Sequence, residues 1–223
     1  RADERAREFL ERYADEPFAA ELRGVWLRSL ADREEWRAYL EHYRPTTDAA
    51  LRCEQLNARI ALDADADLER DIAALWLTPE QLPPECVAPF DWLRAREALD
   101  SSLIEQRVRL LLESGQAAFA RTVARELPAE RAAPLLLSAS LLERPKQTID
   151  ELLAARTPYE PEALLAGWAK LARNDPAAAL ERYADVRRLR GLDGAHASRI
   201  ALALAVGLAW DRWAVARAAF ADV

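Results

Sequence analysis

The segment ALWLTPEQLPPECVAPFDWLRAR, residues Ala74–Arg96, joins two helix-like stretches through a proline-rich corner. A proline lacks the backbone N–H that a helix interior requires, so the pair Pro83–Pro84 interrupts any helix at this point. The corner carries Cys86, and the only other cysteine, Cys53, lies in the preceding segment ALRCEQLNARI. A bond between the two sulfurs would clamp one helical hairpin to the next. We interpret the whole chain as a stack of such hairpins.

The composition favours helix in nearly every part of the 223 residues. Alanine, leucine, arginine and glutamate dominate, there are only 6 glycines, and 51% of the residues are hydrophobic. This mixture has high helix propensity, supplies a core and offers little material for tight strand turns. No segment alternates convincingly between polar and apolar residues, so we expect an all-α protein.

Apolar residues recur with the three-and-four spacing of a helix face in roughly fourteen segments. The second expected helix of the chain, Pro17–Leu30, has Phe18, Leu22, Val25, Trp26 and Leu30 on one side. A later expected helix has Leu68, Ile72, Leu75 and Trp76 on its inner face. The other expected helices span residues 3–13, 35–42, 48–61, 87–98, 116–127, 130–142, 145–155, 161–172, 176–189, 194–208 and 211–221, with a further one that starts at Asp100 or Ser101.

Capping residues mark several of these helix ends. Thr46 or Thr47 is expected to cap the helix at residues 48–61, and Asn174-Asp175-Pro176 is a cap followed by a proline in the first turn. Gly115 is expected to end its helix in a left-handed conformation. Short helices joined by short turns predict an α-superhelix, that is, a solenoid of stacked helical hairpins in a single domain over residues 1–223. The hairpin at residues 167–186 is similar to a tetratricopeptide half-repeat.

The charge balance argues against a nucleic-acid-binding protein. The formal net charge is −7, which repels a phosphate backbone, and arginines alternate with glutamates as on solvated helix faces. The most apolar run, Ile200–Trp210, is too short to span a bilayer, so no membrane span is expected. The chain lacks methionine and begins at Arg1 without a signal segment, and we therefore expect a processed or excised piece of a larger protein.

The sequence contains none of the common motifs of metal-dependent, nucleophilic or nucleotide-binding enzymes. The two histidines, His42 and His196, lie far apart in the chain without a neighbouring metal ligand, and there is no nucleophile elbow or phosphate-binding glycine loop. We therefore predict no catalytic, cofactor-binding or metal-binding residue and no cofactor. The seven tryptophans could stack on sugars, but most lie on apolar stripes and are expected to pack in the core. For Trp210 and Trp213, near the end of the sequence, both roles stay open.

From the residues alone, Cys53 and Cys86 are either two buried thiols or one disulfide. A bridge would close a loop of about 33 residues and remove roughly 3–4 kcal/mol of conformational freedom from the unfolded chain.

Several segments, in order, resemble one known family. They are FLERYADEP, WLRSLADREEWRAYLEHY, LRCEQLNARIAL, the proline corner, LIEQRVRLLLESGQAAFARTVARELPAE and LARNDPAAALERYADV. Together they are similar to the U-shaped helical domain of the soluble lytic murein transglycosylases of Gram-negative bacteria. The resemblance implies a curved superhelix, a disulfide between Cys53 and Cys86, and a periplasmic location.

The complete enzymes of that family cleave peptidoglycan between N-acetylmuramic acid and N-acetylglucosamine and leave a 1,6-anhydro end. A separate lysozyme-like domain, absent from this sequence, carries the catalytic glutamate. Glu113-Ser114 is superficially similar to the catalytic pair, but it precedes Gly115 at a helix end in the part that resembles the superhelix. We reject it as a catalytic acid, because such an acid needs an enclosing cleft.

The resemblance implies a noncatalytic domain that helps the parent enzyme hold glycan strands, with other cell-wall enzymes as further candidate partners. One alternative is a tetratricopeptide-like scaffold of the cell envelope that binds proteins. A third hypothesis is a glycosidase with two carboxylates about 5–9 Å apart in one cleft.

Overall fold

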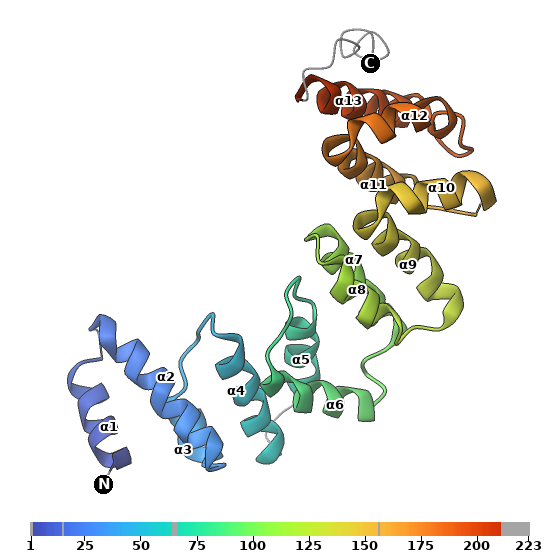
Figure 1. The fold of residues 1–223 in the computed structure, drawn as a ribbon. Coiled ribbons are helices and arrows are strands. Elements are labelled where there is room, and N and C mark those ends of the chain that lie inside the picture. Colours follow the sequence, from blue (N-terminus) through green and yellow to red (C-terminus); the bar gives the residue numbers. More distant parts are fainter. Residues whose placement is uncertain (1, 15, 64–66, 156, 211–223) are drawn as a thin grey trace. The chain divides into compact units, whose positions relative to one another are not determined.

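The structure is a computed structural model of the 223-residue chain, and it describes residues 2–14, 16–63, 67–155 and 157–210. Within these ranges the chain forms thirteen α-helices and one 3-10 turn, and no strand (Figure 1). The prediction of an all-α protein is confirmed. The elements are α1 (Ala2–Arg12), α2 (Pro17–Asp32), α3 (Trp36–His42), α4 (Ala49–Ala61), α5 (Leu68–Trp76), η1 (Pro84–Cys86), α6 (Val87–Ala95), α7 (Ser101–Glu113), α8 (Ala117–Ala124), α9 (Ala129–Glu143), α10 (Pro145–Ala155), α11 (Pro161–Asn174), α12 (Pro176–Val186) and α13 (Gly194–Trp210).

The described helices follow the predicted ones closely, with most ends shifted by a few residues. The predicted helix at residues 211–221 lies outside the described residues. Contacts within the chain divide it into two compact units, residues 1–103 and 104–223, with the division inside α7. The single domain expected over residues 1–223 stays a prediction. Among the described residues, no helix is both long and apolar enough to cross a membrane.

In unit 1, residues 1–103, helices pack mainly on their neighbours in the chain: α1 on α2, α2 on α3, α3 on α4, and α5 on α6. This is the contact pattern of stacked hairpins. The Tyr39 ring is completely buried, and its hydroxyl donates a hydrogen bond of 2.7 Å to the Leu51 carbonyl. Burial raises the pKa of Tyr39, so this hydroxyl stays protonated and fixes α3 against the start of α4.

The expected inner face of α2 is partly wrong. Trp26 and Leu30 are buried as predicted, but Phe18 is 48% exposed and Val25 is 60% exposed. The buried positions are instead shared with Ala19 and Leu27. The reason is that α2 packs against both α3 and α4. The side of α2 that carries the small residue Ala19 therefore lies in the contact, where it lets the helices come close together.

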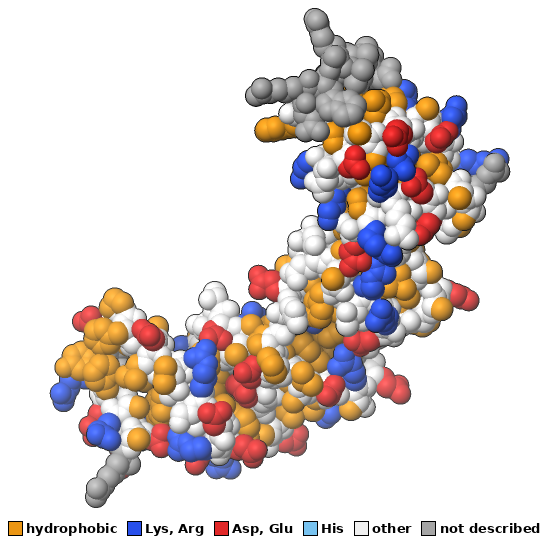
Figure 2. Space-filling model, in the orientation of Figure 1, with side chains coloured by type: hydrophobic (Ala, Val, Ile, Leu, Met, Phe, Trp, Pro, Cys, Tyr) orange, Lys and Arg blue, Asp and Glu red, His pale blue; other side chains and the backbone are white. Residues whose placement is uncertain are grey.

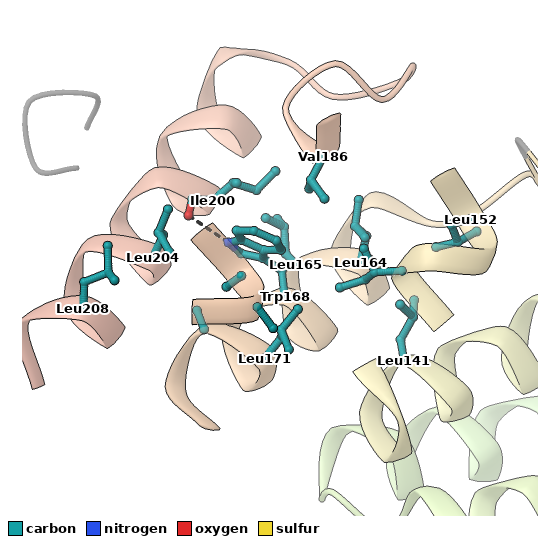
Figure 3. Packing of buried hydrophobic residues seen from close by; sticks show 14 residues of the cluster. Leu141, Leu152, Leu164, Leu165, Trp168, Leu171, Val186, Ile200, Leu204 and Leu208 are labelled. Atoms are coloured by element: carbon teal, nitrogen blue, oxygen red, sulfur yellow. Dashed lines mark hydrogen bonds between the residues drawn. The ribbon is translucent and has the colours of Figure 1, made fainter. Parts of the chain in front are cut away.

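Unit 2, residues 104–223, has its core around α11, which contacts α9, α10, α12 and α13. Figure 3 shows Trp168 of α11 at the centre of this core, with Leu164 and Leu171 from its own helix and Ile200 from α13. The indole nitrogen of Trp168 donates a 2.9 Å hydrogen bond to the Ile200 carbonyl. The bond satisfies a buried polar group, which would otherwise be costly.

Gly167 allows two helices in unit 2 to approach closely. A β-carbon placed on Gly167 would lie 2.9 Å from the Leu141 β-carbon, so α11 meets α9 at van der Waals contact. The close approach is to α9 and not to α12, the partner of α11 in the hairpin at residues 167–186. That hairpin consists of α11 and α12, which contact each other.

The capping predictions are partly confirmed. Asp175 accepts a hydrogen bond from the Ala178 N–H, Asp100 accepts one from Leu103, and Gly115 has a φ of 81°. The cap of α4 was wrongly placed, because Asp48 and not a threonine accepts from the Leu51 N–H. Thr46 instead accepts a hydrogen bond from the Asp48 N–H and so orients the cap.

Candidate functional site

Cys53 of α4 and Cys86 at the end of η1 form a disulfide, with their α-carbons 4.9 Å apart. Both residues are almost completely buried, with exposed fractions of 0% and 1%. The bond lies where α4 contacts both η1 and α6. It therefore joins two consecutive hairpins of unit 1, as the resemblance implied.

Two glutamates and an asparagine lie beside this disulfide. The Asn57 side-chain amide donates to Glu54 Oε2 at 3.0 Å and to the Glu85 backbone carbonyl at 3.1 Å. Burial raises the pKa of Glu54, and the nearby charges of Glu85 and Asp32 raise it further. One carboxylate oxygen of Glu85 is buried without a hydrogen-bond partner among the described residues.

A groove of about 400 Å³ lies in unit 2 between α7, α9 and α11, and we call it the α7–α11 groove. Its apolar part comprises Leu112, Leu135, Leu142, Ala163 and Ala166, and its polar part comprises Arg109, Glu113, Ser138, Glu160 and Glu162. A sugar ring has apolar faces and a polar edge, so a groove with both kinds of lining is chemically suited to it.

An ion-pair network fixes the polar rim of the α7–α11 groove. Glu105 accepts a hydrogen bond from Arg109 at 3.1 Å and one from Arg131 at 2.6 Å, and Arg109 also reaches Glu160 at 3.4 Å. Hydrogen bonds from Arg131 and Arg109 lower the pKa of Glu105. Glu162, on the same rim, pairs with Arg199 at 2.7 Å. These pairs hold charged hydrogen-bonding groups in fixed positions around the groove.

The Glu113-Ser114 pair is not enclosed. Glu113 ends α7 on the rim of the groove and is exposed to solvent. The Ser114 hydroxyl donates a 3.0 Å hydrogen bond to the Leu111 carbonyl. Glu113 is therefore a solvent-exposed residue at the edge of the groove, and its rejection as a catalytic acid stays a prediction.

The tryptophans separate into buried and exposed positions. Trp26, Trp76 and Trp168 are buried, as predicted for core residues. Trp36 and Trp92 are half-buried, and the Arg96 guanidinium lies 3.8 Å from the centre of the Trp92 ring. Trp210 is 80% exposed, and Trp213 lies outside the described residues. A sugar-stacking role is therefore open to Trp210 and closed to the buried three.

The two histidines belong to different units, and the described residues contain no group of three side chains that could hold a metal ion. His196 lies 2.6 Å from an Asp193 carboxylate oxygen near the start of α13. On the face shown in Figure 2, acidic and basic side chains are interspersed over both units. This distribution is the one expected for solvated helix faces.

Comparison with solved structures identifies the fold. The lytic transglycosylase Slt from Pseudomonas aeruginosa, solved as an inactive mutant, is 23% identical with a TM-score of 0.65, and the match covers 97% of this chain and 35% of that chain. A complex of the 70-kDa soluble lytic transglycosylase with bulgecin A is 20% identical with a TM-score of 0.79, covering 97% and 36%. The fold is that of a helical part of a soluble lytic transglycosylase.

A third structure, the 70-kDa soluble lytic transglycosylase Slt70 from Escherichia coli, is 21% identical with a TM-score of 0.74 and is matched over 91% of this chain and 33% of that chain. This chain thus spans about a third of the length of the transglycosylases that it matches. No protein-family model and no curated protein matches its sequence, so the relationship rests on shared three-dimensional structure. The sequence resemblance is confirmed at the level of fold.

Proposed function

We propose that this chain is the noncatalytic superhelical domain of a soluble lytic murein transglycosylase. It helps the parent enzyme hold peptidoglycan while a separate domain cleaves the bond between N-acetylmuramic acid and N-acetylglucosamine and leaves a 1,6-anhydro end. The observation that supports this is the match to the 70-kDa transglycosylase over 97% of the chain at a TM-score of 0.79.

The physical features of the chain support a holding role. The α7–α11 groove offers an apolar floor and a rim of fixed charges, which suits hydroxyl and amide groups on a sugar ring. The buried disulfide is a bond that persists in oxidising compartments, and this favours a periplasmic location. The proposal places the entire chain in one domain, with glycan strands as the main partner.

The proposal has two parts, that the chain binds peptidoglycan and that it does not cleave it. Separate binding and cleavage assays on the purified chain test them. We expect the chain to sediment with insoluble peptidoglycan and to release no soluble muropeptides. Replacing Arg109 by Ala removes the central cation of the groove rim and is expected to reduce the bound fraction. Arg125→Ala, an exposed position outside the groove, is the matched control. Robust cleavage by the chain itself would overturn the noncatalytic assignment, and equal sedimentation of both variants would exclude the groove.

A second candidate function is a scaffold that binds protein segments in the cell envelope. It is favoured by another groove in unit 2, of about 760 Å³, where α10 faces the end of α11. Arg144, Lys146, Asp150 and Glu151 surround its apolar lining, a combination that suits a peptide. A specific peptide ligand whose binding is lost in Asp150→Ala, combined with no retention on peptidoglycan, would favour this function over the first.

A further inference from the structure

Charged side chains from three helices of unit 1 converge on a pocket of about 220 Å³. Arg7 and Glu11 come from α1, Arg23 comes from α2, and His42 and Arg44 lie at the end of α3. In this part of unit 1, α1 packs on α2 and α2 packs on α3 (Figure 1). The pocket is separate from the α7–α11 groove, which lies in unit 2.

His42 lines this pocket, and one of its ring nitrogens has no hydrogen-bond partner among the described residues. That atom, Nε2, is buried. The ring lies against Trp26, with 4.6 Å between the ring centres. Burial lowers the pKa of His42, so the imidazole is neutral at neutral pH and can place its single N–H on Nε2. A ligand oxygen that reached this nitrogen would accept a hydrogen bond from that N–H.

The arginines around the pocket lack carboxylate partners. Neither Arg7 nor Arg23 forms a hydrogen bond or an ion pair with any residue that the structure describes. Arg44 donates only to the carbonyl oxygens of Glu41 and Tyr43, at 3.3 and 2.8 Å, within the described part of the chain. Three arginines thus line the pocket together with one acidic residue, Glu11. In a chain of net charge −7, this is a local excess of positive charge.

The walls of the pocket are held together by Asp3. Its carboxylate accepts a 2.7 Å hydrogen bond from the Trp26 indole and two from the Arg33 guanidinium, at 2.8 and 3.1 Å. These bonds join the start of α1 to α2 and hold the Trp26 ring, against which the His42 ring packs. A site formed in advance loses little freedom when a ligand binds.

We propose that this pocket binds a small oxyanion, a carboxylate or phosphate group. The guanidinium groups of Arg7, Arg23 and Arg44 donate charge-assisted hydrogen bonds to the anion, and His42 Nε2 donates another. Guanidinium groups match the spacing of two oxygens on a carboxylate or phosphate, which is why arginine predominates in such sites. The volume accommodates one such group with few attached atoms. This inference does not depend on the proposed cell-wall function.

Nuclear magnetic resonance of the two histidine side chains tests the proposal directly, because His196 lies in the other unit and serves as an internal control. The full chain is titrated with sodium phosphate and, separately, sodium acetate, with sodium chloride keeping the ionic strength constant. We expect a saturable shift at His42 and none at His196. Arg23→Gln and Arg7→Gln are each expected to weaken binding about tenfold. Arg37→Gln, an exposed position on α3 outside the pocket, should leave affinity unchanged.

A bound anion should also raise the pKa of His42, because negative charge stabilises the imidazolium. The other charges that act on this ring are Glu41 and Glu11, which raise its pKa, and Arg7 and Arg44, which lower it. Affinity for acetate, which stays ionised in this range, should therefore increase as the pH falls through the histidine range. The affinities for phosphate and acetate are then compared, and the higher one indicates whether the pocket prefers a phosphate or a carboxylate group.

Three outcomes would overturn the site: a shift at His42 that does not saturate, equal shifts at both histidines, or equal loss of affinity in Arg37→Gln and Arg23→Gln. Thermal midpoints of all three variants show whether each is folded. Arg7 is exposed, so Arg7→Gln tests the pocket even where Arg23→Gln is destabilised.

Discussion

Gly207 of α13 lies against the backbone of Ala172 in α11, so closely that a β-carbon on Gly207 would be 2.0 Å from the Ala172 carbonyl oxygen. Real β-carbons do not approach a backbone oxygen at this distance, and backbone cannot move aside as a flexible side chain can. The two helices are in contact along the core of unit 2. Their separation is therefore set by the missing side chain.

Gly207→Ala is expected to destabilise unit 2 although alanine favours helix, because α13 must move away from α11. Overpacking of this kind costs about 1–3 kcal/mol in the free energy of unfolding. Gly194→Ala at the start of the same helix is the control, since its β-carbon would meet no atom within 4 Å. Urea denaturation measures both variants. Equal stabilities would show that α13 does not pack on α11 as described.

Trp168→Ala is expected to lose about 3–5 kcal/mol of unfolding free energy, because it removes a fully buried ring and leaves a cavity. The Ile200 carbonyl also loses its hydrogen bond from the indole. Trp210→Ala removes the same ring at a position that is 80% exposed, and its stability should change by less than about 0.5 kcal/mol. Thermal unfolding of the two variants gives the comparison. A larger loss for Trp210→Ala would contradict the described core.

Removal of the disulfide by the double substitution Cys53→Ala and Cys86→Ala should cost roughly 3–4 kcal/mol, because the unfolded chain regains the freedom of a closed loop. The transition of unit 1 reports this loss, followed by tryptophan fluorescence in urea. Protein isolated without reductant and then denatured should show no reactive thiol. Two titratable thiols under those conditions would contradict the bridge.

Glu54 and Glu105 are expected to change stability with pH in opposite directions. The folded-state pKa of Glu54 is raised above its ordinary value of 4.5, so its contribution is most favourable at low pH and is lost as the pH rises through the raised value. Glu54→Gln should therefore stabilise the protein at neutral pH, and this gain should vanish in acid.

The folded-state pKa of Glu105 is lowered by Arg131 and Arg109, so its contribution is present at neutral pH and is lost as the pH falls through that lowered value. Glu105→Gln should therefore destabilise the protein at neutral pH and have little effect in acid. Unfolding free energies from pH 3 to 8, measured for both variants, check the two signs. The same sign for both would contradict the assignments.

Features that depend on neighbouring residues in the chain were predictable. Asp175-Pro176 starts a helix because the cap and the proline act locally, and Gly115 ends one because a left-handed residue costs glycine little. The inner face at Leu68, Ile72, Leu75 and Trp76 was correct because the helix that carries it is short and has one apolar side. The α2 face was wrong at Phe18 and Val25, because α2 has apolar residues on more than one side and tertiary contacts choose among them.

The grooves and the oxyanion pocket depend on residues that are distant in the chain. Glu105 and Arg109 are one turn apart and could be paired from the sequence, but Arg131 and Glu160 reach them only through the packing of α9 and α11. The same holds for His42, whose neighbours in the pocket come from α1 and α2. Sequence spacing gives no signal for this pocket, because Arg7 has Asp3 and Glu11 four residues away and Arg44 has Asp48 four residues away.

The bridge between Cys53 and Cys86 makes the intervening backbone part of a covalent ring. A single nick by a protease anywhere between these residues therefore leaves both fragments attached through sulfur. Such a cut would go unnoticed on a denaturing gel until reductant is added, so the exposed turn at residues 79–81 can be cleaved without releasing either part of unit 1.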